Sequence, residues 1–478
     1  MSLRVGFAGV LAVCLPLSAA FAQSTDNAEL LKRLEEQEQK LKILERKIEL
    51  QDEAAKAATS GAATVRASPS RFSLQSADGA NVARIRGVLH FDGRRFSDDV
   101  TPATADTWLL RRVRPTIEGT VNNIYDYRFT PDFAGGRTII LDAFAVARLK
   151  PWAAITAGKF KVPVGLERIQ SAADIRFIER AFPTSLVPNR DLGVQLGGDF
   201  KGGVINYNVG YFNGVSDGTS SDNNTNPDVD NDTHGDWAAR VFFQPFLNSE
   251  SFVLRGLQFG VGATYVDSTG STTTTLLPSY RTPGQQTFFS FRPTTAAAGT
   301  TPASNGTFAD GERLRITPQF YYSYANYSLL GEYVDLKQDV TRVVGTTSRS
   351  DSLSNSAWQL QFAWFITGEE ETFKGFTPGS TFNVGKPGWG AFELVGRYHV
   401  LEVDEDAFVG GAASFANPAN SAVKASAWGV GVNWYLNQNV KLSLNYDQTE
   451  FDGGAVSGTT VVDRDDEQAI FTRVGISF

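Results

Sequence analysis

The stretch Ala469-Ile-Phe-Thr-Arg-Val-Gly-Ile-Ser-Phe478 alternates apolar and polar side chains and ends on an aromatic residue. In a strand, Ile470 and Val474 point to one side, whereas Arg473 and Ser477 point to the other. A strand with one face in hydrocarbon and the other in water is what a transmembrane β-barrel of a bacterial outer membrane requires. This stretch therefore predicts an all-β fold, an antiparallel transmembrane barrel.

The same alternation recurs along most of the chain after Arg71. Clear examples are 259–265, 358–364, 428–434 and 440–447, where every second residue is apolar or aromatic. A soluble β-sandwich would also alternate, with its apolar face inward. Two features favour the barrel. Trp or Tyr often stands at the end of an apolar face, and short connections alternate with long ones, as on the two rims of an outer-membrane barrel.

Between these connections we count about sixteen strands, an even number that returns both ends of the barrel to the same rim. The strands are expected at 84–94, 107–119, 121–131, 138–149, 152–160, 194–201, 203–212, 236–245, 255–267, 313–324, 328–338, 355–367, 390–402, 427–436, 440–451 and 469–478. One connection, 368–389, is long where a short turn is expected, and the sequence gives no reason for it. A barrel of this size is wide enough for a water-filled channel.

The N-terminal residues 1–22 are expected to be a secretory signal peptide, because an apolar run follows Arg4 and ends in the small-x-small sequence Ala20-Phe21-Ala22. A membrane-spanning helix is disfavoured because the run is too short, and no later stretch approaches twenty apolar residues. The only cysteine, Cys14, lies in this segment, so the mature chain would have no thiol. The formal net charge of −8 argues against nucleic acid as a partner.

Residues 23–58 are expected to form a coiled-coil oligomerisation segment, because apolar residues recur there with heptad spacing. The a and d positions are Asn27, Leu30, Leu34, Gln37, Leu41, Leu44, Ile48, Gln51 and Ala55. Charges of opposite sign flank this seam, which favours a parallel homotrimer in the periplasm over the alternative of a single exposed helix. Residues 59–80 are expected to be a linker to the barrel, residues 81–478.

Charge is segregated along the chain. Between Arg84 and Arg190 there are 17 Lys and Arg against 11 Asp and Glu, although the whole chain is acidic. A basic constriction in a low-dielectric wall concentrates anions locally, and guanidinium groups bind phosphate or carboxylate oxygens in pairs. The alternative is that these arginines pair with acids across the lumen. The basic side chains expected to face the lumen from the first three strands are Arg84, Arg86, Arg94, Arg112, Arg114 and Arg128.

The third long connection, 161–193, contains many large apolar residues, whereas an ordinary surface loop would be polar. We expect it to fold into the lumen and narrow it. Its basic residues would then reach the path of a solute, unless they pair with the acids of the same loop and hold it on the wall. These basic residues are Lys161, Arg168, Arg176, Arg180 and Arg190.

Several segments of this region resemble the phosphate-selective porin O and P family of bacterial outer-membrane porins. They are 158–168 (Gly-Lys-Phe-Lys-Val-Pro-Val-Gly-Leu-Glu-Arg), 177–181 (Phe-Ile-Glu-Arg-Ala), 188–193 (Pro-Asn-Arg-Asp-Leu-Gly), and 111–114 with Glu118-Gly119. The resemblance implies a trimeric, sixteen-stranded barrel with its third loop folded inward. It also implies a basic ladder that guides phosphate or polyphosphate.

The sequence thus predicts an outer-membrane channel for passive diffusion of small anions such as phosphate, pyrophosphate or polyphosphate, with no cofactor. A general or sugar-type porin is one alternative. An enzyme in the barrel is disfavoured because the three histidines, His90, His234 and His399, form no cluster in the sequence. The acidic stretch 222–232 fits no defined calcium loop, so we expect a solvated loop tip rather than a metal site.

Overall fold

The computed structural model describes residues 26–60, 62–68, 71–97, 105–221, 234–295 and 305–478. The chain divides into two compact units, 1–63 and 64–478, which are considered separately. The expected signal peptide and the acidic stretch 222–232 lie outside the described residues.

In the first unit, α1 (Asp26–Ser60) is a single helix of 35 residues. The expected a and d side chains Leu30, Leu34, Leu41, Leu44 and Ile48 are all more than half exposed. A helix with an uncovered apolar seam is suited to association with other helices, so the coiled coil stays a prediction. None of the described helices is both long enough and apolar enough to cross a membrane.

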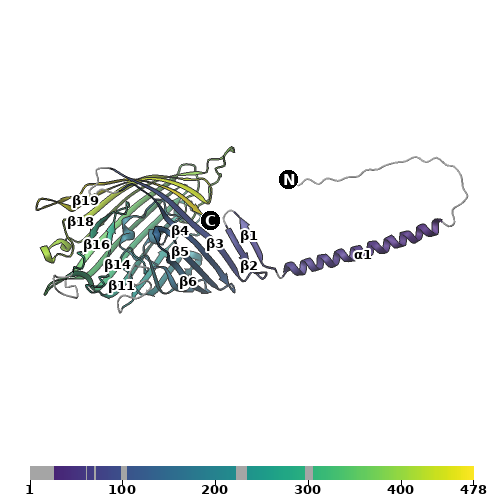
Figure 1. The fold of residues 1–478 in the computed structure, drawn as a ribbon, viewed down its shortest axis with the longest axis horizontal. Coiled ribbons are helices and arrows are strands. Elements are labelled where there is room, and N and C mark those ends of the chain that lie inside the picture. Colours follow the sequence, from purple (N-terminus) through teal and green to yellow (C-terminus); the bar gives the residue numbers. More distant parts are fainter. Residues whose placement is uncertain (1–25, 61, 69–70, 98–104, 222–233, 296–304) are drawn as a thin grey trace. The chain divides into compact units, whose positions relative to one another are not determined.

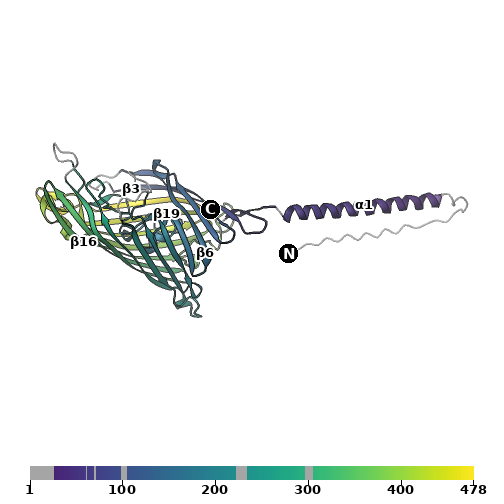
Figure 2. The ribbon, with the colours of Figure 1, turned by 90° about the horizontal axis from the view of Figure 1, so that it is seen from below.

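The second unit is a closed antiparallel barrel of sixteen strands, as predicted (Figure 1; seen from below in Figure 2). Its last strand pairs with its first, from Ala469 opposite Phe96 to Ser477 opposite Val88. The barrel strands are β3 (Val82–Phe96), β4 (Thr107–Val121), β5 (Tyr125–Asp132), β6 (Ile139–Lys150), β7 (Ala153–Lys161), β8 (Arg190–Phe200), β9 (Ile205–Phe212), β10 (Asp236–Phe243), β11 (Leu257–Thr269), β14 (Gly306–Tyr324), β15 (Tyr327–Val344), β16 (Thr347–Phe365), β17 (Ala391–Glu402), β18 (Ala422–Tyr435), β19 (Val440–Ser457) and β21 (Glu467–Ser477).

The remaining elements are short. Two small strands, β12 (Ser279–Arg281) and β13 (Thr287–Ser290), pair with each other, and β20 (Thr460–Asp463) pairs antiparallel with the end of β19. The helical turns are α2 (Leu166–Ile169), α3 (Phe252–Arg255), η1 (Ala134–Gly136), η2 (Phe182–Ser185), η3 (Lys201–Gly203), η4 (Glu405–Phe408) and η5 (Gly411–Ala413).

Two connections differ from the expectation. The segment expected as a linker, 59–80, contains a hairpin of β1 (Thr64–Ser68) and β2 (Arg71–Gln75). Strand β2 pairs with residues 82–85 at the start of β3. Strand β21 pairs with β3 from Val88 onward, so β2 pairs with the part of β3 that β21 leaves free. The expected strands 328–338 and 355–367 leave a long loop at 339–354, and this expectation is wrong, because β15 and β16 stay paired as far as Val344 opposite Thr347.

The side chains of the strands alternate between the outer surface and the interior as predicted. In β21, Ile470 and Val474 are exposed on the outer surface, whereas Arg473 on the other face is 4% exposed. Trp428 and Leu444 are likewise exposed, and Arg112 is buried. The exposed apolar set forms the surface that contacts lipid, and the charged set faces the interior.

Much of that interior is filled by protein. One buried apolar cluster joins Val164 and Phe182, from the connection between β7 and β8, to Val334 and Leu353 of the wall and to Phe288 of β13. Close packing of this kind leaves no room for water. An aqueous path must therefore run along the other side of the barrel.

Candidate functional site

The connection between β7 and β8, residues 162–189, is called the inward loop here because it lies inside the barrel. Its apolar side chains are almost completely buried, with exposed fractions of 2% or less for Val162, Val164, Leu166, Ile175, Phe177, Ile178, Phe182 and Leu186. Burial of a large apolar side chain contributes about 1.5–3 kcal/mol, so this set stabilises the inward position strongly.

Polar groups of the opposite wall hold the backbone of the inward loop. Asn445 of β19 accepts a hydrogen bond from the backbone nitrogen of Ile178 at 2.8 Å. The Arg473 side chain of β21 donates to the carbonyl oxygen of Ile178, also at 2.8 Å. Arg397 of β17 donates to the carbonyl oxygen of Glu179 at 2.8 Å. Because these partners lie on three strands, the loop crosses the lumen in a defined position.

The carboxylate of Glu179 joins the loop to the first two strands. It lies 2.7 Å from Nη2 of Arg94 and 2.6 Å from Nε of Arg111. Burial alone would raise the pKa of the Glu179 carboxyl, but Arg111, Arg112 and Arg94 outweigh it and hold that pKa well below its usual range. Arg94 is therefore engaged with the loop, and it lines neither of the cavities described next.

Two cavities lie on the two sides of the inward loop. The turn-side cavity, of about 770 Å³, is lined by the short turn 437–439 and by Phe478 at the C-terminus. The loop-side cavity, of about 680 Å³, is lined by residues of the long connections, including Gly135 and Ser279. Eight Lys and Arg against three Asp and Glu line the first cavity, and nine against three line the second, so both are strongly basic.

Nine of the eleven residues expected on the path line these cavities. Arg86, Arg128 and Arg176 line the turn-side cavity, and Arg112, Arg168 and Arg180 line the loop-side cavity, while Arg114, Lys161 and Arg190 line both. The other two, Arg84 and Arg94, line neither.

The residues shared by both cavities mark where they meet. They are Arg114, Lys161, Arg190 and the small residue Ala172. Arg114 pairs with Asp132 and Arg190 pairs with Asp142, each at 2.7 Å. The Lys161 ammonium instead donates to the carbonyl oxygen of Gln170 at 2.7 Å. The junction thus carries one more cation than it has carboxylate partners.

Arg168 and Arg180 add further unbalanced charge beside the junction. Arg180 donates to the carbonyl oxygens of Glu167 and Gln170, at 3.1 and 2.7 Å, and Arg168 donates to the carbonyl oxygen of Thr184. In the described part of the chain neither forms an ion pair. Burial, with the neighbouring Arg180, lowers the pKa of Arg168 to about 9, and burial lowers the pKa of Arg180 to about 10. Both guanidinium groups therefore stay charged at neutral pH.

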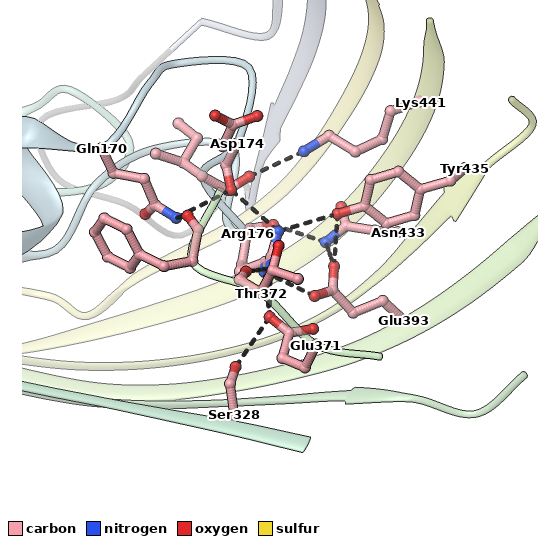
Figure 3. A network of polar contacts seen from close by, with 12 residues as sticks. Gln170, Asp174, Arg176, Ser328, Glu371, Thr372, Glu393, Asn433, Tyr435 and Lys441 are labelled. Carbon is pink, nitrogen blue, oxygen red and sulfur yellow. Dashed lines mark hydrogen bonds and ion pairs between the residues drawn. The ribbon is translucent and has the colours of Figure 1, made fainter. Parts of the chain in front are cut away.

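Two other path residues share an acid on the turn side. Arg128 lies 2.7 Å and Arg86 lies 3.4 Å from the carboxylate of Glu118. Arg176 differs from both, since its side chain is only 4% exposed and pairs with Glu371 and Glu393 (Figure 3). Its charge is balanced by acids rather than presented to the cavity.

The structure adds basic residues that the sequence reasoning missed. They are Arg111, Arg137, Arg281, Lys374 and Lys441. Lys441 could have been found, because it lies opposite the lipid-facing set of its strand, as the alternation of 440–447 shows. Arg111 could not, because a bulge in the pairing of β3 and β4 turns both Arg111 and Arg112 inward.

Two of the three histidines, His90 and His399, pack in the interior, whereas His234 is exposed. His399 Nδ1 lies 3.3 Å from the backbone nitrogen of Phe182, and His90 Nδ1 lies 3.1 Å from Arg112. Among the described residues, no three His, Cys, Asp or Glu side chains come together in a way that could hold a metal ion.

A family model for the phosphate-selective porin O and P matches residues 84–471, which include all sixteen strands in whole or part. The chain belongs to this porin family. The barrel is therefore an outer-membrane channel. Porin O of Pseudomonas aeruginosa is 35% identical over 98 residues, which are 20% of this chain and 21% of that protein. The matched stretch thus spans about a fifth of that relative.

Solved structures of outer-membrane barrels share the fold at low sequence identity. The outer-membrane channel DcaP of Acinetobacter baumannii is 11% identical with a TM-score of 0.50, covering 84% of this chain and 99% of its own. The trimer form of OmpT, an outer-membrane protein of Vibrio cholerae, is 10% identical with a TM-score of 0.50, covering 84% of this chain and all of its own. These similarities concern the barrel fold alone.

Proposed function

We propose that this porin passes small anions, with phosphate, pyrophosphate and polyphosphate as the substrate class, through the basic junction of its two cavities. The observation that carries this proposal is the charge of Arg168 and Arg180, which no carboxylate within the described residues balances by an ion pair. Cations in a narrow, low-dielectric passage raise the local concentration of anions. Guanidinium groups also match the oxygen geometry of phosphate.

The arrangement favours passage over trapping. Arg281 and Arg180 line the loop-side cavity, Arg114 and Arg190 the junction, and Arg128 the turn-side cavity. Several of these cations already bind a carboxylate, which weakens their hold on a passing anion. A series of weak sites lets an ion exchange from one to the next, whereas one tight site would retain it.

The sugar-type alternative would need aromatic surfaces along the path. Five Phe or Tyr side chains line the turn-side cavity, but no Phe, Tyr or Trp among the described residues lines the loop-side cavity, so no continuous aromatic surface follows the path. We therefore favour anions over sugars as the substrate class, and we propose that the barrel carries out no catalysis.

We further propose that the channel is a homotrimer and that α1 forms a parallel coiled coil in the periplasm. The exposed seam of Leu30, Leu34, Leu41, Leu44 and Ile48 supports association. Strand β3 begins at the rim of short turns, which in outer-membrane barrels faces the periplasm.

Planar-bilayer recordings test the substrate class. Under a gradient of potassium chloride, we expect a reversal potential of anion-preferring sign, and a cation-preferring sign would refute the proposal. Adding phosphate or pyrophosphate should reduce the chloride conductance, because these anions occupy the same guanidinium sites. Anion preference without such block would indicate a general porin without phosphate selectivity.

A further inference from the structure

The connection between β16 and β17, residues 366–390, is the longest on its rim, where 244–256 is the next longest and the other connections are turns of two to four residues. It turns into the barrel close to the wall. Ser328 of β15 donates to the Glu371 carboxylate at 3.1 Å, and the backbone nitrogen of Glu371 donates to the carbonyl oxygen of Ala325 at 2.8 Å. Phe373 packs edge-on against Tyr321 of β14, with ring centroids 5.2 Å apart. The first part of this connection therefore occupies the lumen.

The β16–β17 connection meets the inward loop, although the two enter the barrel from opposite rims. Gln170 of the loop donates to the carbonyl oxygen of Phe373 at 2.9 Å. Figure 3 shows Arg176 of the loop at the centre of this meeting point. Its Nη2 donates to the carbonyl oxygen of Thr372 at 2.6 Å, and its Nε lies 3.1 Å from the Glu371 carboxylate. A buried guanidinium with several partners fixes the position of both segments.

A second acid completes the contact from the wall. Glu393 of β17 lies 2.8 Å from Nε of Arg176 and accepts hydrogen bonds from Tyr435 and Asn433 at 2.9 and 2.8 Å (Figure 3). Arg176 thus faces two carboxylates, Glu371 and Glu393. An arginine neutralised in this way offers little attraction to a passing anion.

Lys374 of the same connection has the opposite character. It lines the turn-side cavity, its side chain is exposed, and it forms no ion pair within the described residues. Its backbone is fixed on both sides. Thr372 donates to the carbonyl oxygen of Lys374 at 2.6 Å, and Phe376 packs between Phe365 and Tyr435, with centroids 4.3 and 5.0 Å away.

We propose that the β16–β17 connection forms a second constriction of the channel, in which Lys374 contacts the passing anion and Arg176 is a positioning residue that holds Lys374 in place. Arg176 then does not itself bind the passing anion. This inference rests on the proposed anion channel for the nature of the ion. The lining role of Lys374 can be measured whatever the preferred ion.

Cysteine labelling tests the lining role, because the expected mature chain has no cysteine of its own. A Lys374→Cys channel is reacted in the bilayer with a sulfonate-bearing or an ammonium-bearing methanethiosulfonate. We expect the negative reagent to lower anion conductance and the positive reagent to restore it, by about twofold per unit charge. Lys386→Cys, on the same connection but lining neither cavity, is the matched control.

A purely structural role for Lys374 would make both reagents act alike, since they differ mainly in charge. Equal effects of the two reagents, or equal responses at positions 374 and 386, would overturn the proposal. If the unmodified channel prefers cations but responds to charge only at position 374, the proposed substrate class fails while the second constriction stands.

The role of Arg176 is tested through its partner. Glu371→Gln removes one of the two carboxylates that face Arg176 and should loosen the connection. We expect the charge-dependent effect at Lys374→Cys to shrink at least about twofold in this background, because the residue is no longer held beside the path. Undiminished labelling effects in the folded double variant would show that Arg176 does not position Lys374.

Discussion

Replacing Glu179 with Gln should release the inward loop from the first two strands while leaving the barrel folded. The carboxylate binds Arg94 at 2.7 Å and Arg111 at 2.6 and 3.1 Å, and Arg94 is almost fully buried. Gln keeps the volume of the side chain but removes the charge. Both guanidinium groups then lose their loop partner, and Arg94 keeps only Asp92 at 3.9 Å.

The size of the effect follows from burial. Breaking a buried ion pair by removing one partner costs about 3–5 kcal/mol. Because Arg111 is 28% exposed and can be rehydrated, the lower end of that range applies, about 3 kcal/mol. This corresponds to an increase of about a hundredfold in the population of the undocked loop. The strand ladder is not touched, so the barrel itself should keep its stability.

Limited trypsin digestion of the detergent-solubilised porin measures loop release, because Arg176 and Arg180 lie within the loop. Cleavage there should be about a hundredfold faster in the variant, and open-channel noise should rise. Arg148→Gln is the control, because Arg148 pairs with Asp126 at 3.0 Å on the turn-side rim and contacts no loop residue among those described. Equal cleavage rates for wild type and Glu179→Gln would refute this account of loop docking.

The remaining predictions address pH, charge and the N-terminal helix. The Glu179 pKa is depressed in the folded state, so its stabilisation is present above the unfolded value of about 4.3 and is lost only as pH falls through the folded value. Open-channel noise recorded at pH 5 should therefore equal that at pH 7, and a rise at pH 5 would contradict the assignment. Arg180→Glu should lower the anion-to-cation permeability ratio on the order of tenfold, since it changes two unit charges beside the path, and an unchanged reversal potential would place Arg180 outside it. Deleting residues 27–55 should leave heat-modifiable migration intact, because those side chains that the structure describes bury no barrel face, whereas loss of that migration would show that the barrel needs the helix.

The sequence predicted the barrel well because lipid imposes a strict period of two. All sixteen expected strands are found, and the errors of the prediction concern the residues at which strands begin and end. Strand β16 begins at Thr347 rather than 355, since 347–354 is polar and extends the ladder beyond the part that contacts lipid. Beyond the part that contacts lipid, both faces of a strand can be polar, so the alternation of apolar and polar residues no longer marks where the strand ends.

The site was harder to predict because its contacts join residues far apart in the chain. The inward position of 162–189 follows from its apolar content, but the partners of its charges do not. Arg176 pairs with Glu371, 195 residues away, so its neutralisation has no local signature. The bulge that brings Arg111 beside Arg112 is equally invisible, because a single extra residue breaks the alternation that the prediction used.

The charges of the interior explain how an acidic chain can hold an anion path. Asp132, Asp142 and Glu118 each lie beside an arginine that lines a cavity, so they moderate its attraction without reversing it. Beside the junction of the two cavities, Arg180 is bound by carbonyl oxygens instead, which orient the guanidinium but leave its charge uncompensated. The net charge of −8 is a property of the whole chain, whereas an ion in the lumen responds to the side chains within about 10 Å. Converting Arg180 to Gln should therefore reduce anion preference more than converting Arg86, which shares Glu118 with Arg128 and whose side chain is 56% exposed.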